Sequence, residues 1–158
     1  MTIELSDEKI HNNSVEEISK VIIKRLGLGP RKIDSQIPIN NLLIEFYERT
    51  KKATQEKNPE FAIMTIDEIK DILNLTRQTS YDYINRWLEV RIITKMSYSK
   101  NGKIIKGYKL NGISLENAFL KTVSTIKEIL DETNDLIHEL QKNIKNEKIR
   151  NTLKNKDN

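Results

Sequence analysis

Residues 64–89 have the sequence MTIDEIKDILNLTRQTSYDYINRWLE and contain two helical patterns joined by a very short turn. In the first, Thr65 and Glu68 form a capping box, in which a hydroxyl and a carboxylate bind free amides of the first turn. Asn74-Leu75 is the expected turn, and Thr76 is the expected N-cap of a second helix that ends near Glu89. The second helix should bury one face, made of Thr79 or Ser80, Tyr83, Ile84, Trp87 and Leu88.

A basic β-hairpin is predicted directly after these helices. Residues 92–98 and 103–110 are rich in β-branched and aromatic residues, and Ser99-Lys-Asn-Gly102 lies between them. Asn-Gly is the strongest short-range hairpin signal, because a type I′ turn needs positive φ at both central residues. From Arg91 to Leu110 the chain has no acidic residue and six basic ones: Arg91, Lys95, Lys100, Lys103, Lys106 and Lys109.

Two more helices and a short strand are predicted before residue 64. The first helix begins at the capping box Ser14-Val-Glu-Glu17 and stops at Gly27, with its apolar stripe at Val15, Ile18, Ile22 and Leu26. Pro38 suits the first turn of the second helix, whose stripe contains Ile39, Leu42, Leu43, Phe46 and Tyr47. Asn58-Pro59 ends this helix, and the apolar run 61–64 has the length of a small strand. The sequence leaves open whether the first helix packs against the following domain or against a dimer.

The C-terminal part of the chain predicts one long helix that needs an apolar partner. No Gly or Pro occurs after Ser114, and apolar residues recur in alternating steps of four and three. This seam spans roughly 38 Å at 1.5 Å per residue, which is longer than a small domain can cover. We therefore expect a homodimer, as a two-stranded coiled coil or a small bundle. The expected dimerisation residues are Phe119, Val123, Ile126, Leu130, Thr133, Ile137, Leu140 and Ile144.

The predicted order of elements is helix, short strand, helix, tight turn, helix and basic hairpin. Over residues 37–112, about half of the chain, this order resembles the winged helix-turn-helix domain of archaeal-type DNA-binding transcription regulators. Residues 64–89 carry the resemblance, although Asn74 stands where many relatives place Gly. The Leu26-Gly-Leu-Gly-Pro-Arg-Lys32 lead-in and the layout are similar to those of the euryarchaeal activators of archaellum genes. The resemblance implies a mainly α fold with a small β-hairpin (α+β), and a second helix that reads DNA.

The expected DNA contacts follow from the side-chain chemistry of the second helix and the hairpin. An Arg can pair with guanine, and a Gln or Asn with adenine, in the major groove. The candidate DNA-binding positions of the helix are Thr76, Arg77, Gln78, Thr79, Tyr81, Asn85 and Arg86. The hairpin would contact phosphates, which adds affinity without sequence information, through Lys95, Lys100, Asn101, Lys103 and Lys106. The alternatives are a merely solvated helix face and a hairpin whose lysines protect its edges from strand pairing.

Composition argues against several other functions. The 158 residues include no cysteine, which excludes disulfides and thiolate metal sites and fits a reducing compartment. They include two histidines, which argues against histidine-based metal or acid–base chemistry. Asp67, Glu68 and Asp71 crowd a helix start, where carboxylates favour the dipole, so we interpret them as caps and expect no metal. There is no phosphate-binding Gly loop and no nucleophile–base motif, so we expect neither an enzyme nor a cofactor. The chain has no apolar run of membrane-spanning length, and we expect a cytoplasmic protein without an export signal.

The sequence therefore predicts a homodimeric, sequence-specific regulator that binds double-stranded DNA. The expected divisions are an N-terminal segment (1–36), the winged helix-turn-helix domain (37–112), the long helix (113–150) and a disordered Asn/Lys-rich tail (151–158). Two alternatives stay open: a winged-helix module that binds protein, such as the basal transcription machinery, and a chromatin or partition protein with little sequence preference. The Ile-, Lys- and Asn-rich composition is typical of an A+T-rich archaeon or low-GC bacterium.

Overall fold

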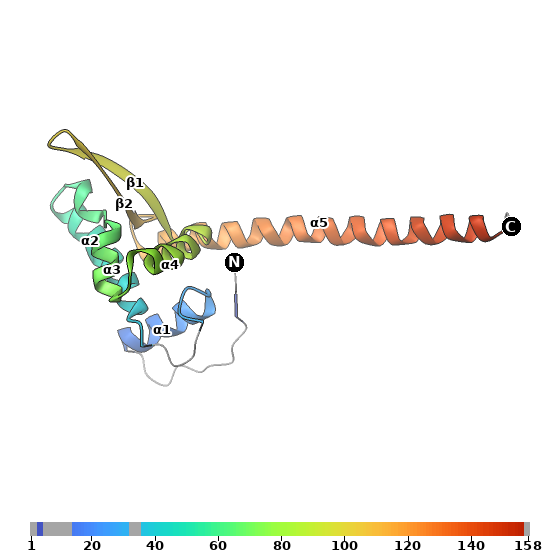
Figure 1. Cartoon of the computed structure of the whole chain (residues 1–158), viewed down its shortest axis with the longest axis horizontal. Coiled ribbons are helices and arrows are strands. Elements are labelled where there is room, and N and C mark those ends of the chain that lie inside the picture. The colour runs from blue at the N-terminus through green and yellow to red at the C-terminus, as the bar shows by residue number, and fades with distance from the viewer. Residues whose placement is uncertain (1–2, 5–13, 32–35, 157–158) are drawn as a thin grey trace. The chain divides into compact units, whose positions relative to one another are not determined.

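The computed structural model describes residues 3–4, 14–31 and 36–156, and the expected α+β composition is confirmed. The described elements are α1 (Val15–Arg25), α2 (Ile39–Gln55), the 3-10 helix η1 (Pro59–Ala62), α3 (Ile66–Leu73), α4 (Arg77–Glu89), β1 (Ile93–Lys100), β2 (Lys103–Leu110) and α5 (Leu115–Lys156) (Figure 1). Mainly helical structure, one small antiparallel hairpin and a long C-terminal helix are therefore present. The chain divides into two compact units, one up to Thr122 and one from Val123 onward.

The N-caps of α1, α3 and α4 form as the sequence predicts. Ser14 Oγ accepts a hydrogen bond from the Glu17 amide at 3.2 Å, and Thr65 Oγ1 accepts one from the Glu68 amide at 3.3 Å. Thr76 Oγ1 accepts one from the Thr79 amide at 3.2 Å. Each bond satisfies an amide that has no partner within its helix. Between α3 and α4, Asn74 adopts the left-handed conformation with φ 54°, which Asn tolerates better than most residues.

One core joins α1 to the helices and the hairpin of the first unit, which settles where α1 packs. The rings of Phe46 and Trp87 lie 6.1 Å apart between centroids, and both side chains are fully buried. Ile23, Leu26 and Leu28 belong to the same core, and Trp87 Nε1 donates a hydrogen bond to the Leu28 carbonyl at 3.1 Å. The first helix and its lead-in are thus part of this domain.

The buried face of α1 differs from the predicted stripe. Val15 is 69% exposed and Ile22 is 40% exposed, whereas Ser19 and Ile23 are buried. Two adjacent isoleucines, Ile22 and Ile23, allow a helix to turn either one inward, so the pattern was ambiguous. Ser19 tolerates burial because its hydroxyl donates to the Glu16 carbonyl at 2.9 Å.

The strand predicted at residues 61–64 is wrong in most of its length. Pro59–Ala62 form η1, which Asn58 opens by accepting a hydrogen bond from the Glu60 amide at 3.1 Å. Pro59 favours this turn because its fixed φ suits a helix start. Met64 does form an isolated antiparallel bridge with Tyr108, through backbone hydrogen bonds of 2.7 and 2.8 Å. Gly107 permits this close approach, since a Cβ there would lie 2.6 Å from the Met64 carbonyl oxygen.

The hairpin forms with the predicted Asn-Gly turn, and its first strand extends two residues further than expected, to Lys100. Strands β1 and β2 pair from Ile93 opposite Leu110 to Lys100 opposite Lys103. Asn101 and Gly102, the two residues between the strands, have φ angles of 53° and 76°. Both values are positive, as a type I′ turn requires.

The second unit contains the exposed part of α5. Along the predicted seam Val123, Leu130, Ile137, Leu140 and Ile144 are exposed, while Ile126 is half-buried. We expected disorder after Arg150, but α5 continues to Lys156; residues 157–158 lie outside the described residues. The tail contains no Gly or Pro to stop the helix, and Thr152 Oγ1 donates to the Lys148 carbonyl at 2.9 Å. In the described part of the chain, no helix combines the length and the apolar character that crossing a membrane demands.

Candidate nucleic-acid interface

The exposed side of α4 carries a ridge of polar side chains. Ser80, Tyr83, Ile84 and Trp87 turn inward and are buried, which leaves the opposite side of the helix in solvent. There, an exposed row follows the helical spacing of four and three residues: Gln78, Asp82 and Asn85. An amide can pair with adenine in bidentate fashion, and a carboxylate can accept from cytosine N4. This ridge can therefore present base-reading chemistry over two helical turns.

Arg77 lies beside the ridge, at the first position of α4, and has defined neighbours. Its Nη1 atom lies 4.0 Å from Asp67 Oδ1, and both side chains are 60% exposed. A hydrogen bond with Tyr81 and the charge of Asp67 raise the pKa of Arg77 above its usual value. Tyr81 and Asp67 thus restrict the orientation of Arg77 without burying its side chain.

A hollow of about 760 Å³ separates α4 from the hairpin, and we call it the hairpin hollow. Arg77 and Tyr81 line it from α4, Asp67 from α3, and Lys95 and Lys106 from the strands. Three basic groups therefore face one carboxylate. Burial raises the pKa of Tyr108, which also lines the hollow, and Tyr81 adds to the shift. The Tyr108 hydroxyl can donate a hydrogen bond, and together with the three basic groups it makes the hollow suitable for an anion.

The predicted hairpin residues divide into two sets. Side chains alternate between the two faces of a strand, and residues directly opposite in the register share a face. Lys95 is opposite Tyr108 and Lys106 is opposite Ser97, and all four line the hairpin hollow. Lys100, Asn101 and Lys103 are exposed at the tip and do not line it.

The tip places two positive charges against each other. Lys100 is directly opposite Lys103, and like charges in this position destabilise a hairpin. An anion between or beside the two ammonium groups would relieve their repulsion. The tip is therefore a second place on the hairpin where a phosphate would be stabilising.

Arg86, predicted as a DNA contact, has well-defined partners within the protein. Its Nη1 atom donates to the carbonyls of Gly27 at 3.1 Å and Gly29 at 2.8 Å. Its guanidinium carbon lies 4.6 Å from the centre of the Tyr83 ring. Arg86 therefore ties the lead-in between α1 and α2 to α4. The partners are 57 and 59 residues away in the sequence, so no local pattern could predict them.

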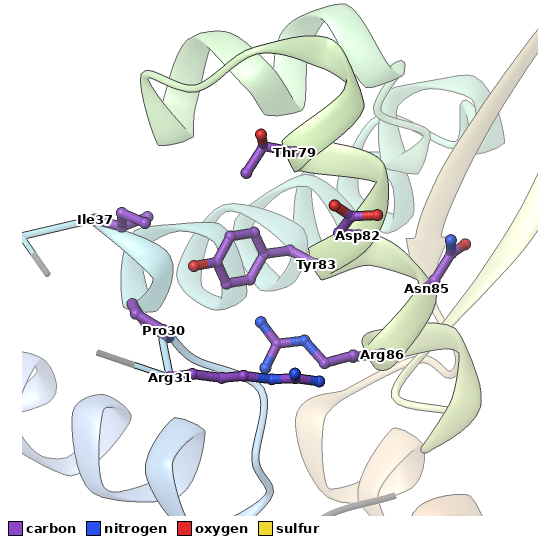
Figure 2. Close-up of a pocket in the computed structure, with 8 residues that line it drawn as sticks. All are labelled: Pro30, Arg31, Ile37, Thr79, Asp82, Tyr83, Asn85 and Arg86. Carbon is purple, nitrogen blue, oxygen red and sulfur yellow. The ribbon is translucent and has the colours of Figure 1, made fainter. Parts of the chain in front are cut away.

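Sequence reasoning also missed a second hollow, of about 570 Å³, which we call the lead-in hollow. Figure 2 shows Thr79, Asp82, Tyr83, Asn85 and Arg86 of α4 together with Pro30, Arg31 and Ile37. Thr79, a predicted DNA contact, lines this hollow, while Thr76 is exposed at the N-cap. The signal available in the sequence was the Gly-Pro-Arg of the lead-in, residues 29–31, which pointed to a helix stop and not to a site.

The predicted dimerisation residues all lie on α5. Phe119 belongs to the first unit, and the others, from Val123 to Ile144, belong to the second. Thr133 Oγ1 donates to the Ile129 carbonyl at 2.7 Å, so its hydroxyl is satisfied within its own helix. Ile129 and Leu136 are also exposed and widen the apolar stripe. Apolar surface of this extent normally associates with another surface.

Comparisons of the chain with models of protein families, with characterised proteins and with solved structures gave no match.

Proposed function

We propose that this chain is a homodimeric, sequence-specific transcription regulator that binds double-stranded DNA. One observation carries the proposal. The ridge Gln78–Asp82–Asn85 has base-reading side chains, and it runs beside a hollow whose lysines come from the hairpin. A helix of this kind fits the major groove, while the neighbouring basic groups fit the phosphates that border it. We accordingly propose that residues 37–112 act as a winged helix-turn-helix, with the hairpin as its wing.

The second part of the proposal is the dimer, with a second copy of this chain on the α5 seam. A dimer with two-fold symmetry places two α4 helices on two related half-sites, separated by about one or more helical turns of DNA. The exposed apolar stripe of the second unit supports this proposal.

The direct test is selection of bound duplexes from a random library by the full chain, at two salt concentrations. We expect enrichment of a motif with two related halves, and affinity that falls steeply with salt. Binding without enrichment would contradict sequence specificity and favour a chromatin or partition role. No binding would overturn the proposal and leave a protein as partner. From the resemblance we further propose that the regulated genes are archaellum genes. The selected motif should then occur upstream of such genes, and its absence there would contradict this part of the proposal.

The dimer has a matched test on a single helix. Ile137 and Ile149 are both 58% exposed, but Ile149 lies outside the seam. Ile137→Glu should halve the mass measured by sedimentation, and Ile149→Glu should leave it unchanged. An unchanged mass for Ile137→Glu, or equal loss in both variants, would contradict the seam.

A further inference from the structure

The lead-in hollow lies on the other side of the α4 ridge from the hairpin hollow. In a helix with 100° per residue, Arg77 and Tyr81 fall on one side of the Gln78–Asp82–Asn85 row, and Thr79 and Arg86 fall on the other. The first pair lines the hairpin hollow and the second pair lines the lead-in hollow. A duplex seated on the ridge would therefore meet a hollow on each side.

The wall of the lead-in hollow is held in place by the domain core. Arg86 binds the carbonyls of Gly27 and Gly29, and Trp87 binds the carbonyl between them, that of Leu28. A Cβ on Gly29 would lie 3.0 Å from Ile23 Cγ2, so the segment is packed closely against α1. Arg31 follows two residues later and is exposed. The three hydrogen bonds to α4 thus hold the backbone of residues 27–29, which ends two positions before Arg31.

The described lining of this hollow is positive on balance, because two arginines and one aspartate contribute to it. The partners of Arg86 are two carbonyls and an aromatic ring, none of which carries a negative charge. Within the described residues, neither Arg31 nor Arg86 has a carboxylate at ion-pair distance. Asp82 is the acidic residue among the lining side chains. Figure 2 shows the two arginine side chains running alongside each other on the lower wall of the hollow.

We propose that the lead-in hollow binds a backbone phosphate of the duplex whose bases α4 reads, with Arg31 as its ligand and Arg86 as a positioning residue. This inference rests on the proposed function. A guanidinium presents a planar fork of donors that matches a phosphate. Asp82 and Asn85 belong both to the hollow and to the ridge, so an anion in the hollow lies next to the bases that the ridge contacts. The lead-in is thereby a third DNA-contacting element, alongside α4 and the hairpin.

The first experiment measures the salt dependence of binding to the selected duplex for the full chain and for Arg31→Ala. Losing one phosphate contact should make the slope of log Kobs against log[salt] shallower by about 0.9, and should weaken all duplexes alike. The matched control is Lys51→Ala, which removes one positive charge from the exposed side of α2, outside both hollows. The control should keep the wild-type slope. An unchanged slope for Arg31→Ala would overturn the inference while leaving the proposed function intact.

The second experiment locates the phosphate and distinguishes it from a free anion. Neutral methylphosphonate links are placed one at a time along the duplex. At one position per half-site, the neutral link should weaken binding of the wild type but should not weaken binding of Arg31→Ala. Inorganic phosphate is the competing probe. If it bound tightly to the wild type and not to Arg31→Ala, while the DNA slopes were equal, the site would be one for a free anion and the inference would fall. A wild-type chain that bound no duplex would overturn the inference and the proposed function together.

The positioning role of Arg86 has its own readout. In an Arg86→Gln background the lead-in loses two of its three hydrogen bonds to α4, so Arg31→Ala should change the slope by less than about 0.9. Arg86→Lys retains the charge without the planar guanidinium that lies over the Tyr83 ring, and it should behave like Arg86→Gln. If Arg31→Ala kept its full effect in both backgrounds, Arg86 would have no role in positioning Arg31.

Discussion

The two hollows beside α4 have the same sign of charge but are built in different ways. In the hairpin hollow, Lys95 and Lys106 stand on a two-stranded sheet, and Arg77 is oriented by Asp67 and Tyr81. In the lead-in hollow, the wall is bonded to α4 itself through Arg86 and Trp87. The base of the hairpin is held by the Met64–Tyr108 bridge, and its tip extends beyond this bridge as an exposed turn. The hairpin side thus combines an anchored base with an exposed tip, whereas the lead-in side is held by side chains of the helix that would read the bases.

Among the variants that test this difference between the two hollows, Trp87→Ala should have the largest effect on stability. Removing a fully buried indole should lower the free energy of unfolding by about 3–5 kcal/mol, measured by urea unfolding with circular dichroism. Trp87→Phe keeps an aromatic ring in the core but removes the bond to Leu28 and part of the buried volume, and it should cost less than Trp87→Ala. In that variant amide hydrogen exchange should increase in residues 27–31 and not in the hairpin. Equal increases in both places would contradict the different construction of the two sides.

Asn85→Ala and Arg77→Ala compare the two sides by specificity. Each should cost about 1–3 kcal/mol of binding to the preferred duplex and relax its sequence requirement. The residues are eight positions apart, so about 12 Å separates them along α4, and each should relax different base pairs. Repeating the library selection with both variants measures this. Equal loss on all sequences would show that these residues do not read bases.

Arg86→Gln and Arg77→Gln compare the sides by stability. Arg86 gives up two hydrogen bonds and a contact with an aromatic ring, and should lose about 1–2 kcal/mol of unfolding free energy. Arg77 is exposed, and its loss should stay within about 0.5 kcal/mol. Urea unfolding of the two variants checks the difference. If both variants lost the same unfolding free energy, the hydrogen bonds of Arg86 to the lead-in would not stabilise the fold.

The smallest effect on stability is expected at the hairpin tip. Replacing Lys100 and Lys103 by Ala removes two like charges that face each other, which should leave the fold unchanged or stabilise it by a few tenths of a kcal/mol. DNA binding should weaken on all sequences and the salt slope should become shallower, with Lys51→Ala as control. A slope equal to that of the wild type would remove the tip from the interface.

The features that local chemistry determines were predictable, and those that depend on distant partners were not. Thr76 as N-cap, Asn74 in the turn and Asn101-Gly102 in the hairpin each depend on residues within a few positions. The helical period also placed Gln78 and Asn85 on the exposed side of α4, but Asp82 was not among the predicted contacts. The role of Arg86 depends on carbonyls of a segment that precedes α2, so its charge alone suggested a DNA contact.

Two other differences had local causes that the pattern could not resolve. Adjacent isoleucines at 22 and 23 gave α1 two plausible faces, and packing against the core chose Ile23. The apolar run at 61–64 fits a strand by composition, but Pro59 and the Asn58 cap started a 3-10 turn before pairing could extend beyond Met64.

Gly107 has a consequence for how the hairpin tolerates change. Because a Cβ at this position would lie 2.6 Å from the Met64 carbonyl oxygen and from Ile63 Cγ2, every substitution there must displace the segment that leads into α3. No atom lies within 4 Å of a Cβ built on Gly102, so space does not limit substitution there. The positive φ of Gly102 limits it instead, because few residues other than Gly and Asn adopt this conformation. A saturation library of the hairpin should therefore tolerate Asn at Gly102 and no replacement at Gly107. Over evolution the hairpin can therefore accept a replacement at Gly102 in its turn, whereas Gly107 has to remain glycine.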